Sequence, residues 1–515
     1  MIPIPIRKAL ILATLVLLSL EGASCAQAQP QPDTLIVNAT LISAERSRPL
    51  DNAWIRIGGD RIAAIGTGEP VLTGARIIDA DHAYVIPGLI DSHVHLYHAT
   101  GLRHQYTTDY DSLYQGYMAQ QPRSFLFYGF TTVVELNADA ATNQRFEVAP
   151  VHPHLVHCGQ GIVLSDGFMA LELDGTPVGE AYPGYLIDHY AGGFIPEGAD
   201  PTRHTPGAVV DHVIAEGGSC IKLYYEEANW WPGGAPPFRL PSVEILRDVV
   251  AEAHARGLPV LLHATTPEGH AVGLAAGVDV LAHGMWEWTG QSFTDPQPSV
   301  TIREIARQVA ASHIAVQPTF QTIQNTASLF RPDVLEDPRW RDVVPSAYLD
   351  YLRGDAQVQR ERFTDMFAEA ILGEGLDMSD MPQAQAAYSS RYEQLIGTMD
   401  TDGAHFIFGS DTAVGGFGWA SPPGLAEYWE MQDWQRVGIS LATLFRSLTI
   451  NNARAFGLDG EIGTIERGKR ADLLILRANP LEDVAAYDTI ELVILAGVPM
   501  RRELLSAEQD GQIER

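Results

Sequence analysis

Hydrophobic and polar positions change their pattern twice along the 515-residue chain. From Thr34 to about Ile86, short β-rich runs are separated by turns, and Gly58-Gly59-Asp60 is a typical hairpin signal. The far end returns to this style, with predicted strands over 471–476 and 492–495. Two β-rich segments at opposite ends of one chain predict a small β-sandwich. We expect residues 29–87 and 456–515 to build it together.

Between these ends, apolar β-rich runs alternate with helix-like stretches. Such alternation is typical of βα units around a parallel sheet. Eight runs qualify as strands, the number that a closed (β/α)₈ barrel, or TIM barrel, requires. They are the run that ends at His93, Thr131–Leu136, His154–Cys158, Cys220–Tyr224, Val260–His263, Val278–Ala282, Ile314–Gln317 and Phe406–Gly409. The sequence therefore predicts an α/β protein with a TIM barrel over residues 88–455.

A long polar stretch over residues 326–399 interrupts this alternation after the seventh predicted strand. Its periodicity predicts helices over 360–372 and 383–395. We interpret the stretch as a helical insertion in the barrel. Two roles stay open for it, a cover over the site and a decoration of the barrel rim.

The first 28 residues have the pattern of a signal peptide. Arg7 and Lys8 precede the apolar run Ala9–Leu20, and Ala26-Gln27-Ala28 has the A-x-A form of a cleavage site. This run is too short to span a bilayer, and we expect no transmembrane segment. Cys25 offers an alternative, lipid attachment at a processed cysteine. We therefore expect an exported protein, periplasmic or secreted.

The net charge limits the possible binding partners, and the cysteine content bears on whether the protein contains disulfides. The 34 basic and 64 acidic residues give a formal net charge of -30, which would repel nucleic acid and anionic lipid. After cleavage at Ala28, the remaining cysteines are Cys158 and Cys220, both in apolar strand-like runs. Two cysteines do not make a disulfide framework, so we expect buried free thiols, with a single bridge as the alternative.

The most informative stretch is Pro87-Gly88-Leu89-Ile90-Asp91-Ser92-His93-Val94-His95. On a strand, residues two apart point the same way, so His93 and His95 project together, as two ligands of one metal must. Later predicted strand ends carry Lys222, His263, His283 and Asp411. Active sites of such barrels lie at the carboxyl ends of the strands. Imidazole and carboxylate ligands suit Zn²⁺, and the sequence therefore predicts a metal centre there.

Through these residues the chain resembles the amidohydrolase superfamily, in the branch of imidazolonepropionase-like and Xaa-Pro dipeptidase (prolidase)-like enzymes. The resemblance covers nearly the whole mature chain. The motifs that carry it are P-G-L-I-D-S-H-V-H, G-F-T-T-V at 129–133, I-K-L-Y at 221–224, A-H-G at 282–284, G-S-D-T at 409–412, and the segments 449–457 and 463–476.

The resemblance implies two divalent metal ions, Zn²⁺ foremost. The implied ligands are His93, His95 and Asp411 for the first ion, His263 and His283 for the second, and a Lys222 carboxylated by CO₂ as the bridge between them. A hydroxide shared by the ions would attack the substrate. Asp411 would move its proton to the leaving group, and the ion near His263 would polarise the substrate carbonyl.

Two departures from the branch concern substrate recognition. Val134-Glu135 stand where the branch has an Arg-Asp pair, and residues 162–167 occupy the place of a glycine-rich stretch with a histidine. We therefore transfer no dipeptide specificity. Tyr224, Tyr225 and Trp288 lie on or near strand-end loops and are candidate substrate contacts.

The function expected from the sequence is hydrolysis of an amide or peptide-like C–N bond in a small molecule, such as an N-acyl amino acid or a dipeptide. One alternative keeps the site and changes the bond, to that of a lactone, carbamate or phosphotriester. Another is a catalytically inactive barrel that serves as a binding protein. A homo-oligomer is compatible with all three readings.

Overall fold

The computed structural model describes residues 33–72, 74–102, 110–171, 175–227, 238–292, 294–373, 375, 377–413 and 419–509. The expected signal peptide and Cys25 lie outside the described residues. Within the described part of the chain, no helix combines the length and the apolar character needed to cross a membrane.

Strands from both chain ends form one eight-stranded sheet, in the order β16-β15-β14-β5-β1-β2-β3, with β4 also on β1. The strands are β1 (Thr34–Leu41), β2 (Leu50–Gly58), β3 (Arg61–Thr67), β4 (Arg76–Asp79), β5 (Tyr84–Pro87), β14 (Leu473–Leu476), β15 (Ile490–Leu495) and β16 (Val498–Arg501). The first half of β1 pairs with β4 and its second half with β5. The sheet encloses its own core, which includes Ile36, Ile55 and Leu473.

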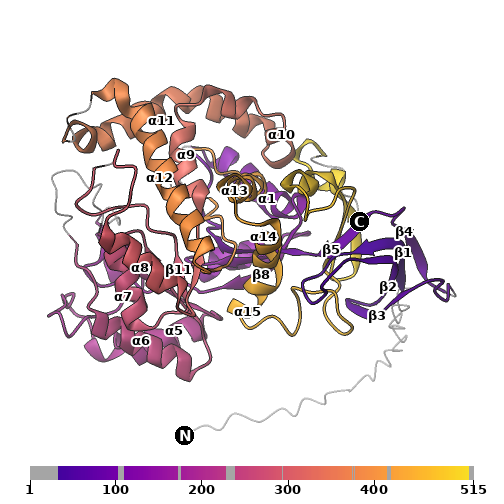
Figure 1. Cartoon of the computed structure of the whole chain (residues 1–515). Helices are drawn as coiled ribbons and strands as arrows, with labels where there is room; N and C mark the ends of the chain where they lie inside the picture. The colour runs from indigo at the N-terminus through magenta and orange to yellow at the C-terminus, as the bar shows by residue number, and fades with distance from the viewer. Residues whose placement is uncertain are drawn as a thin grey trace, which may run out of the picture.

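Eight parallel strands, together with the helices between them, form the larger part of the molecule (Figure 1). The predicted α/β fold is confirmed. One sheet holds three strands, β6 (Leu89–Val94), β7 (Phe130–Glu135) and β8 (His154–His157). The other holds five, β9 (Ile221–Tyr225), β10 (Val260–Ala264), β11 (Val280–Ala282), β12 (Ala315–Gln317) and β13 (His405–Phe406). Each predicted strand overlaps one of these elements, although the run Phe406–Gly409 shares only Phe406 with β13.

Isolated parallel bridges connect the two sheets at both edges. Ile162 pairs with Leu223 of β9, and Val94 of β6 pairs with Thr412, which follows β13. The backbone N–H of Asp411 also donates to the carbonyl oxygen of His93 over 2.8 Å. Because of this contact, the carboxyl ends of the first and last parallel strands lie side by side.

Helices follow most of the parallel strands. They are α1 (Asp111–Phe127), α2 (Ala140–Glu147), α3 (Phe168–Leu171), α4 (Val178–Ala181), α5 (Pro206–Ala215), α6 (Val243–Ala255), α7 (Pro267–Ala276), α8 (Val300–Ala310), α13 (Leu425–Val437), α14 (Leu441–Arg446) and α15 (Asn452–Ala455). Helix α6 shows why they form. The Ser242 hydroxyl caps its N-terminus by accepting from the N–H of Ile245, and apolar residues such as Val249 and Ala253 recur on its buried face.

The insertion between β12 and β13 consists of α9 (Phe320–Ser328), α10 (Trp340–Val343), α11 (Ser346–Gly373) and α12 (Met381–Thr401). Both predicted helices lie inside the longer α11 and α12. The insertion packs on loops at the carboxyl ends of the parallel strands. The Tyr348 hydroxyl donates to the carbonyl of Thr100 after β6, and the Arg391 guanidinium lies 4.4 Å from the ring centre of Trp288 after β11.

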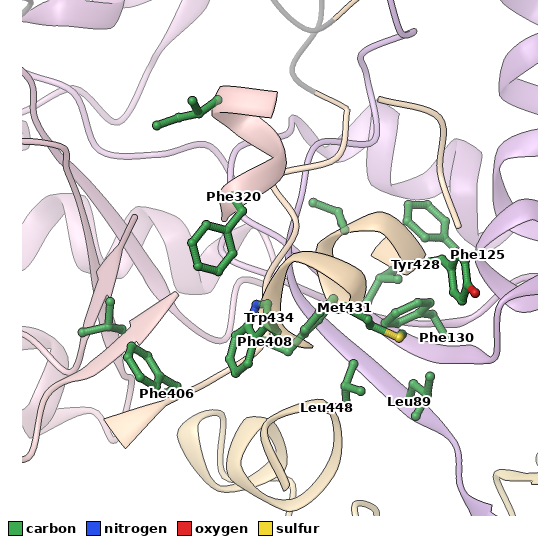
Figure 2. Close-up of a cluster of buried hydrophobic side chains, with 14 of the residues drawn as sticks. Leu89, Phe125, Phe130, Phe320, Phe406, Phe408, Tyr428, Met431, Trp434 and Leu448 are labelled. Atoms are coloured by element: carbon green, nitrogen blue, oxygen red, sulfur yellow. The ribbon is translucent and has the colours of Figure 1, made fainter. Parts of the chain in front are cut away.

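Large aromatic side chains fill the space between the parallel strands and α13 (Figure 2). Phe130 and Phe408 stack with ring centres 5.8 Å apart, and Trp434 of α13 lies 5.9 Å from Phe408. These three side chains are fully buried. Such dense packing fixes the strand ends that follow, on which the candidate site is built.

Cys158 and Cys220 form a disulfide with Cα atoms 4.4 Å apart, so the expectation of two free thiols is wrong. Cys158 follows β8 directly, and Cys220 precedes β9. The Ser219 N–H donates to the carbonyl of His157, which brings the end of one strand next to the start of the other. The sequence separation of 62 residues hides this proximity.

Candidate metal centre

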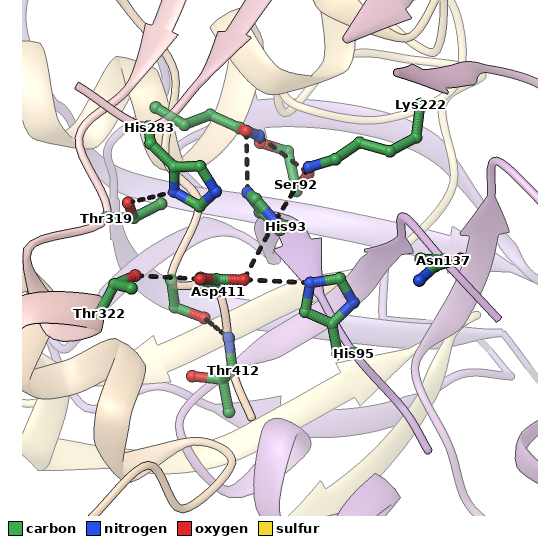
Figure 3. A network of polar contacts seen from close by, with 12 residues as sticks. Ser92, His93, His95, Asn137, Lys222, His283, Thr319, Thr322, Asp411 and Thr412 are labelled. Atoms are coloured by element: carbon green, nitrogen blue, oxygen red, sulfur yellow. Dashed lines mark hydrogen bonds and ion pairs between the residues drawn. The ribbon is translucent and has the colours of Figure 1, made fainter. Parts of the chain in front are cut away.

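Three predicted ligands converge where β6 and the segment after β13 meet (Figure 3). Oδ1 of Asp411 lies 3.1 Å from Nε2 of His93 and 3.0 Å from Nε2 of His95. Potential ligand atoms of these residues all lie within 4.8 Å of one another. The predicted parallel projection of the two histidines therefore leads to one common point.

The backbone around Asp411 explains this convergence. Asp411 has φ +61°, a left-handed conformation that is unusual for a residue with a side chain, and it aims the carboxylate at the histidines. The Thr322 hydroxyl of α9 donates to Oδ2 over 3.0 Å. A Cβ atom at Gly409 would lie 2.8 Å from the Cβ of His93, so only glycine permits the close approach of these two segments.

His263 and His283 complete a ring of imidazoles. The His283 ring centre lies 5.0 Å from that of His93 and 4.7 Å from that of His263. His263 is the last residue but one of β10, and His283 follows β11 with φ +92°. The structure thus brings the two candidate ligands of the second metal next to the first group.

Lys222 enters the same site from β9. Its side chain is 1% exposed, and Nζ lies 3.5 Å from Nε2 of His93. Burial lowers the pKa of this amine to about 8. A sizeable uncharged fraction at physiological pH suits a lysine that reacts with CO₂, because the neutral amine is the nucleophile.

Each of the four imidazoles has a protein partner on one ring nitrogen. Nδ1 of His93 lies 3.1 Å from Gln317, and Nδ1 of His95 lies 3.5 Å from Glu135. Nε2 of His263 lies 2.7 Å from Glu226, and Nδ1 of His283 lies 2.9 Å from Thr319. The opposite nitrogen of each ring is left to the interior of the site. Metal-binding histidines are held in this way, so the donor set fits a divalent ion.

Burial also sets the charge of these groups. It lowers the pKa of His93 and of His263 to about 3 and that of His283 well below its usual value, which favours the neutral, ligating form. His95 differs. Burial opposes its protonation, but hydrogen bonds to Asp411 and Glu135 raise its pKa to about 9. A metal cation would take the place of this proton between His95 and Asp411.

Sequence reasoning missed the residues that hold the candidate ligands. Glu135 accepts from the backbone N–H groups of Leu96 and Asn137 while it faces His95. It stands at one of the two departures from the branch, which was the available signal for a different local role. Glu226 follows Tyr225 directly and lies on His263, but a lone glutamate near a strand end carries no pattern that marks it.

The three candidate substrate contacts lie in different surroundings. Tyr224 lies over His263, with ring centres 5.8 Å apart, and its buried hydroxyl has no hydrogen-bond partner among the described residues. Tyr225 is partly buried and packs against the main hydrophobic core. Trp288 is buried, and its indole N–H donates to the carbonyl of Met285. Tyr224 is therefore the one with a free polar group beside the histidines.

Parallel βα units with a buried histidine–carboxylate group at the strand ends form the architecture of a metallohydrolase barrel. The chain belongs to the amidohydrolase family. A model of the amidohydrolase family matches residues 208–501, and a second with the same description matches residues 84–286. This membership confirms the superfamily inferred from the sequence, and it supports an enzyme that acts on carbon–nitrogen bonds and uses a divalent metal.

Individual relatives are distant. The chain is 34% identical over 67 residues to 5-methylthioadenosine/S-adenosylhomocysteine deaminase 1 of Syntrophus aciditrophicus, and 36% identical over 75 residues to adenine deaminase 3 of Rhizobium johnstonii. These matches cover 12% and 14% of this chain, and only 15% and 12% of the relatives. Among solved structures, a Xaa-Pro dipeptidase with bound methionine aligns with a TM-score of 0.61 at 19% identity, over 91% of this chain and all of the other. That likeness establishes the fold.

Proposed function

We propose that the protein hydrolyses an amide or peptide-like C–N bond in a small substrate, by metal-dependent catalysis. The observation that carries this proposal is the convergence of His93, His95 and Asp411 on one point, with His263 and His283 beside them. Family membership supports the carbon–nitrogen class of bond. The finer choice of an amide rests on the resemblance of the motifs.

The donor set suits two divalent ions, which we propose to be Zn²⁺. His93, His95 and Asp411 would hold one ion and His263 and His283 the other, with a carboxylated Lys222 between them. When bound, such ions supply a water made nucleophilic near neutral pH and polarise the substrate carbonyl. A carbamate at Lys222 removes an ammonium that would repel the cations and provides two anionic oxygens.

Asp411 is the proposed general base and acid. Burial opposes its ionisation, but His93 and the other facing histidines hold the pKa of its carboxyl well below the usual value, so it is a carboxylate at neutral pH. The Thr322 hydrogen bond fixes the orientation of this carboxylate. From that position it accepts the proton of the attacking water and passes it to the leaving nitrogen.

Tyr224 is the proposed donor to the substrate carbonyl. Its hydroxyl is buried and free among the described residues, and its ring lies against His263. Burial raises the pKa of this phenol well above its usual value, so the group keeps the proton that it must donate. Trp288 is assigned to the apolar boundary of the pocket. The core packing of Tyr225 argues against a direct contact with substrate.

Export is part of the proposal. The bridge between Cys158 and Cys220 fits an oxidising compartment, where disulfides persist. Together with the signal-peptide pattern it supports a periplasmic or secreted enzyme, with lipid attachment at Cys25 as the alternative.

A substrate panel on metal-loaded mature protein, beginning near Gln29, tests the proposal. The panel holds an N-acyl amino acid, a dipeptide, a lactone, a carbamate, a phosphotriester and adenine. We expect the amides to be turned over fastest and His263→Asn to lose this activity. His270→Asn is the control, because His270 is a buried histidine that bonds the carbonyl of Ala264 and lies outside the ligand set.

Two results would contradict the proposal. A faster reaction with the lactone, carbamate, phosphotriester or adenine would move the enzyme to another bond. Well under one bound metal per chain, with no gain of activity on addition of Zn²⁺ or Mn²⁺, would make the protein a binding protein instead.

A further inference from the structure

A polar cavity of about 690 Å³ is lined in part by helix α9, and none of the candidate metal ligands lines it. Its walls come from α9, from the segment around α10 and from α13, helices that stand together in Figure 1. Thr322 of α9 bonds Asp411 on one helix face, whereas Gln321, Asn325 and Ser328 line the cavity from another. Their spacing of four and three residues keeps them on one stripe of the helix. The cavity has a size typical of small-molecule sites.

Asn325 is the feature that points to a ligand. Its side chain lines the cavity, is 1% exposed, and finds no hydrogen-bond partner for either amide atom among the described residues. A buried carboxamide offers two N–H donors and one carbonyl acceptor, and native proteins rarely leave both unmet. A bound molecule that both donates and accepts would satisfy it.

The charges around the cavity are already paired for the most part. Asp337 binds Arg339 over 2.6 Å, and Asp433 binds Arg436 over 2.6 Å. Asp488 likewise pairs with Arg502. The other charged side chains of the wall, Arg331 and Asp333, are exposed and opposite in sign. A ligand with net charge would therefore find no unpaired countercharge in the buried part of the cavity.

The uncharged side chains of the cavity wall indicate which class of ligand the cavity would bind. Gln321 and Ser328 lie beside Asn325, but the Gln321 amide already donates to Asp433 and the Ser328 hydroxyl to the carbonyl of Asn325, so Asn325 carries the selection. Trp429 of α13 presents a half-buried aromatic ring to the same space. Carboxamides bind hydroxyl groups, which donate and accept at once, while an aromatic ring packs against C–H groups. We propose that this cavity is a second ligand site, separate from the metal centre, for a neutral polyhydroxylated molecule such as a mono- or disaccharide.

Calorimetric titration of the full mature, metal-loaded protein with glucose and with sucrose tests the proposal. We expect saturable binding of at least one sugar and a loss of about tenfold or more in affinity in Asn325→Leu, because the leucine offers neither donor nor acceptor. Gln432→Ala, a change at an exposed residue of the cavity wall, is expected to weaken binding without affecting folding.

Asn143→Leu is the matched control. Asn143 of α2 is also buried with both amide atoms unpaired among the described residues, but it is not part of this wall. Equal binding losses in Asn325→Leu and Asn143→Leu would overturn the proposal, as would heat signals that rise linearly without saturation. Saturable binding of glycine, inorganic phosphate or Mg²⁺ with no binding of either sugar would overturn the ligand class. The readout does not require turnover, so it stands apart from the proposed hydrolysis.

Discussion

Three residues of the candidate site have a strained backbone conformation. His283, Thr319 and Asp411 all have positive φ, at +92°, +48° and +61°. Each such conformation costs about 1–3 kcal/mol in a residue with a side chain, and the surroundings must compensate. Here the compensation includes hydrogen bonds between Thr319 and His283 and between Thr322 and Asp411. These backbone conformations point the side chains at the strand ends toward the centre of the site.

Under the proposed two-metal site, Lys222→Ala is expected to lose metal and at least about a hundredfold of the activity, because the proposed carbamate bridge is removed. A short carboxylic acid such as propionate is expected to restore part of both, because its two oxygens replace the carbamate. Metal analysis and turnover, with and without the acid, measure the effect.

Lys469→Ala is the control for the loss of a buried ammonium. Lys469 is 9% exposed and bonds Thr464 near the terminal sheet, away from the metal centre. A fully active Lys222→Ala protein would refute the carbamate. A mononuclear site with the histidines and Asp411 would then describe the enzyme better.

At this scale the sequence predicted the residues that lie in recognisable motifs. His93 and His95 follow from a two-residue spacing on a strand, and Lys222, His263, His283 and Asp411 from their positions at later strand ends. Thr319, Thr322 and Glu226 did not follow, because their role depends on how loops fold back onto the ligands. A single threonine or glutamate has no periodicity from which that geometry can be read.

Strands were more predictable than helices at the scale of elements. All eight barrel strands are marked by short apolar runs, but α11 begins at Ser346, well before its predicted start. Its first turns are held by the buried Tyr348, Leu349 and Leu352, which contact other parts of the molecule. Tertiary packing, absent from a local pattern, extends this helix.

The disulfide joins the residue after β8 to the residue before β9, so its removal should affect the edges of both parallel sheets. Cys158→Ala with Cys220→Ala is expected to lower the free energy of unfolding by about 2–5 kcal/mol, because the closed loop of the unfolded chain is released. Lys222 lies two residues beyond Cys220, so metal retention is expected to fall as well. Urea unfolding and metal analysis check the two effects.

A direct assay of the bond accompanies this experiment. Mass spectrometry of the unreduced, digested protein is expected to show the peptides of Cys158 and Cys220 linked. Free thiols at both positions in protein purified from an oxidising compartment, or a double variant as stable as the parent, would contradict the structural role of the bridge.

The whole molecule is acidic, and buried histidines of the candidate site add a pH dependence to its stability below neutrality. Burial lowers the pKa of His93, His263 and His283, so the unfolded chain binds protons below about pH 6.5 that the folded metal-free protein does not. The pKa of His95 is raised to about 9, so its proton stabilises the folded state, and this contribution is fully present below about pH 6.5. The contribution of these three histidines to the stability of the metal-free protein should therefore fall between about pH 7 and about pH 5.5. The buried carboxyls of Asp91 and Asp433 act in the opposite direction, because burial raises their pKa values to about 7 and about 6.

Urea unfolding of metal-stripped protein at the two pH values measures this loss. His283→Asn, which removes one of the three groups, is expected to lose less stability than the parent protein between the two pH values. An equal change in the two proteins would mean that this imidazole is protonated in the folded state, against the low pKa that burial gives it.

The sheet shared by the two ends of the chain also fixes an order of folding. Strand β14 pairs with β5 from Leu476 against Tyr84 to Leu473 against Pro87, a contact between segments that lie far apart in the sequence. Contacts so distant in sequence form slowly, and until they form the backbone groups of β5 remain an open edge. Strand β14, which is synthesised late, thus completes the sheet that the N-terminal strands begin. A chain that stops short of Leu473 would keep this edge exposed, which is the condition that favours aggregation and disposal by proteases.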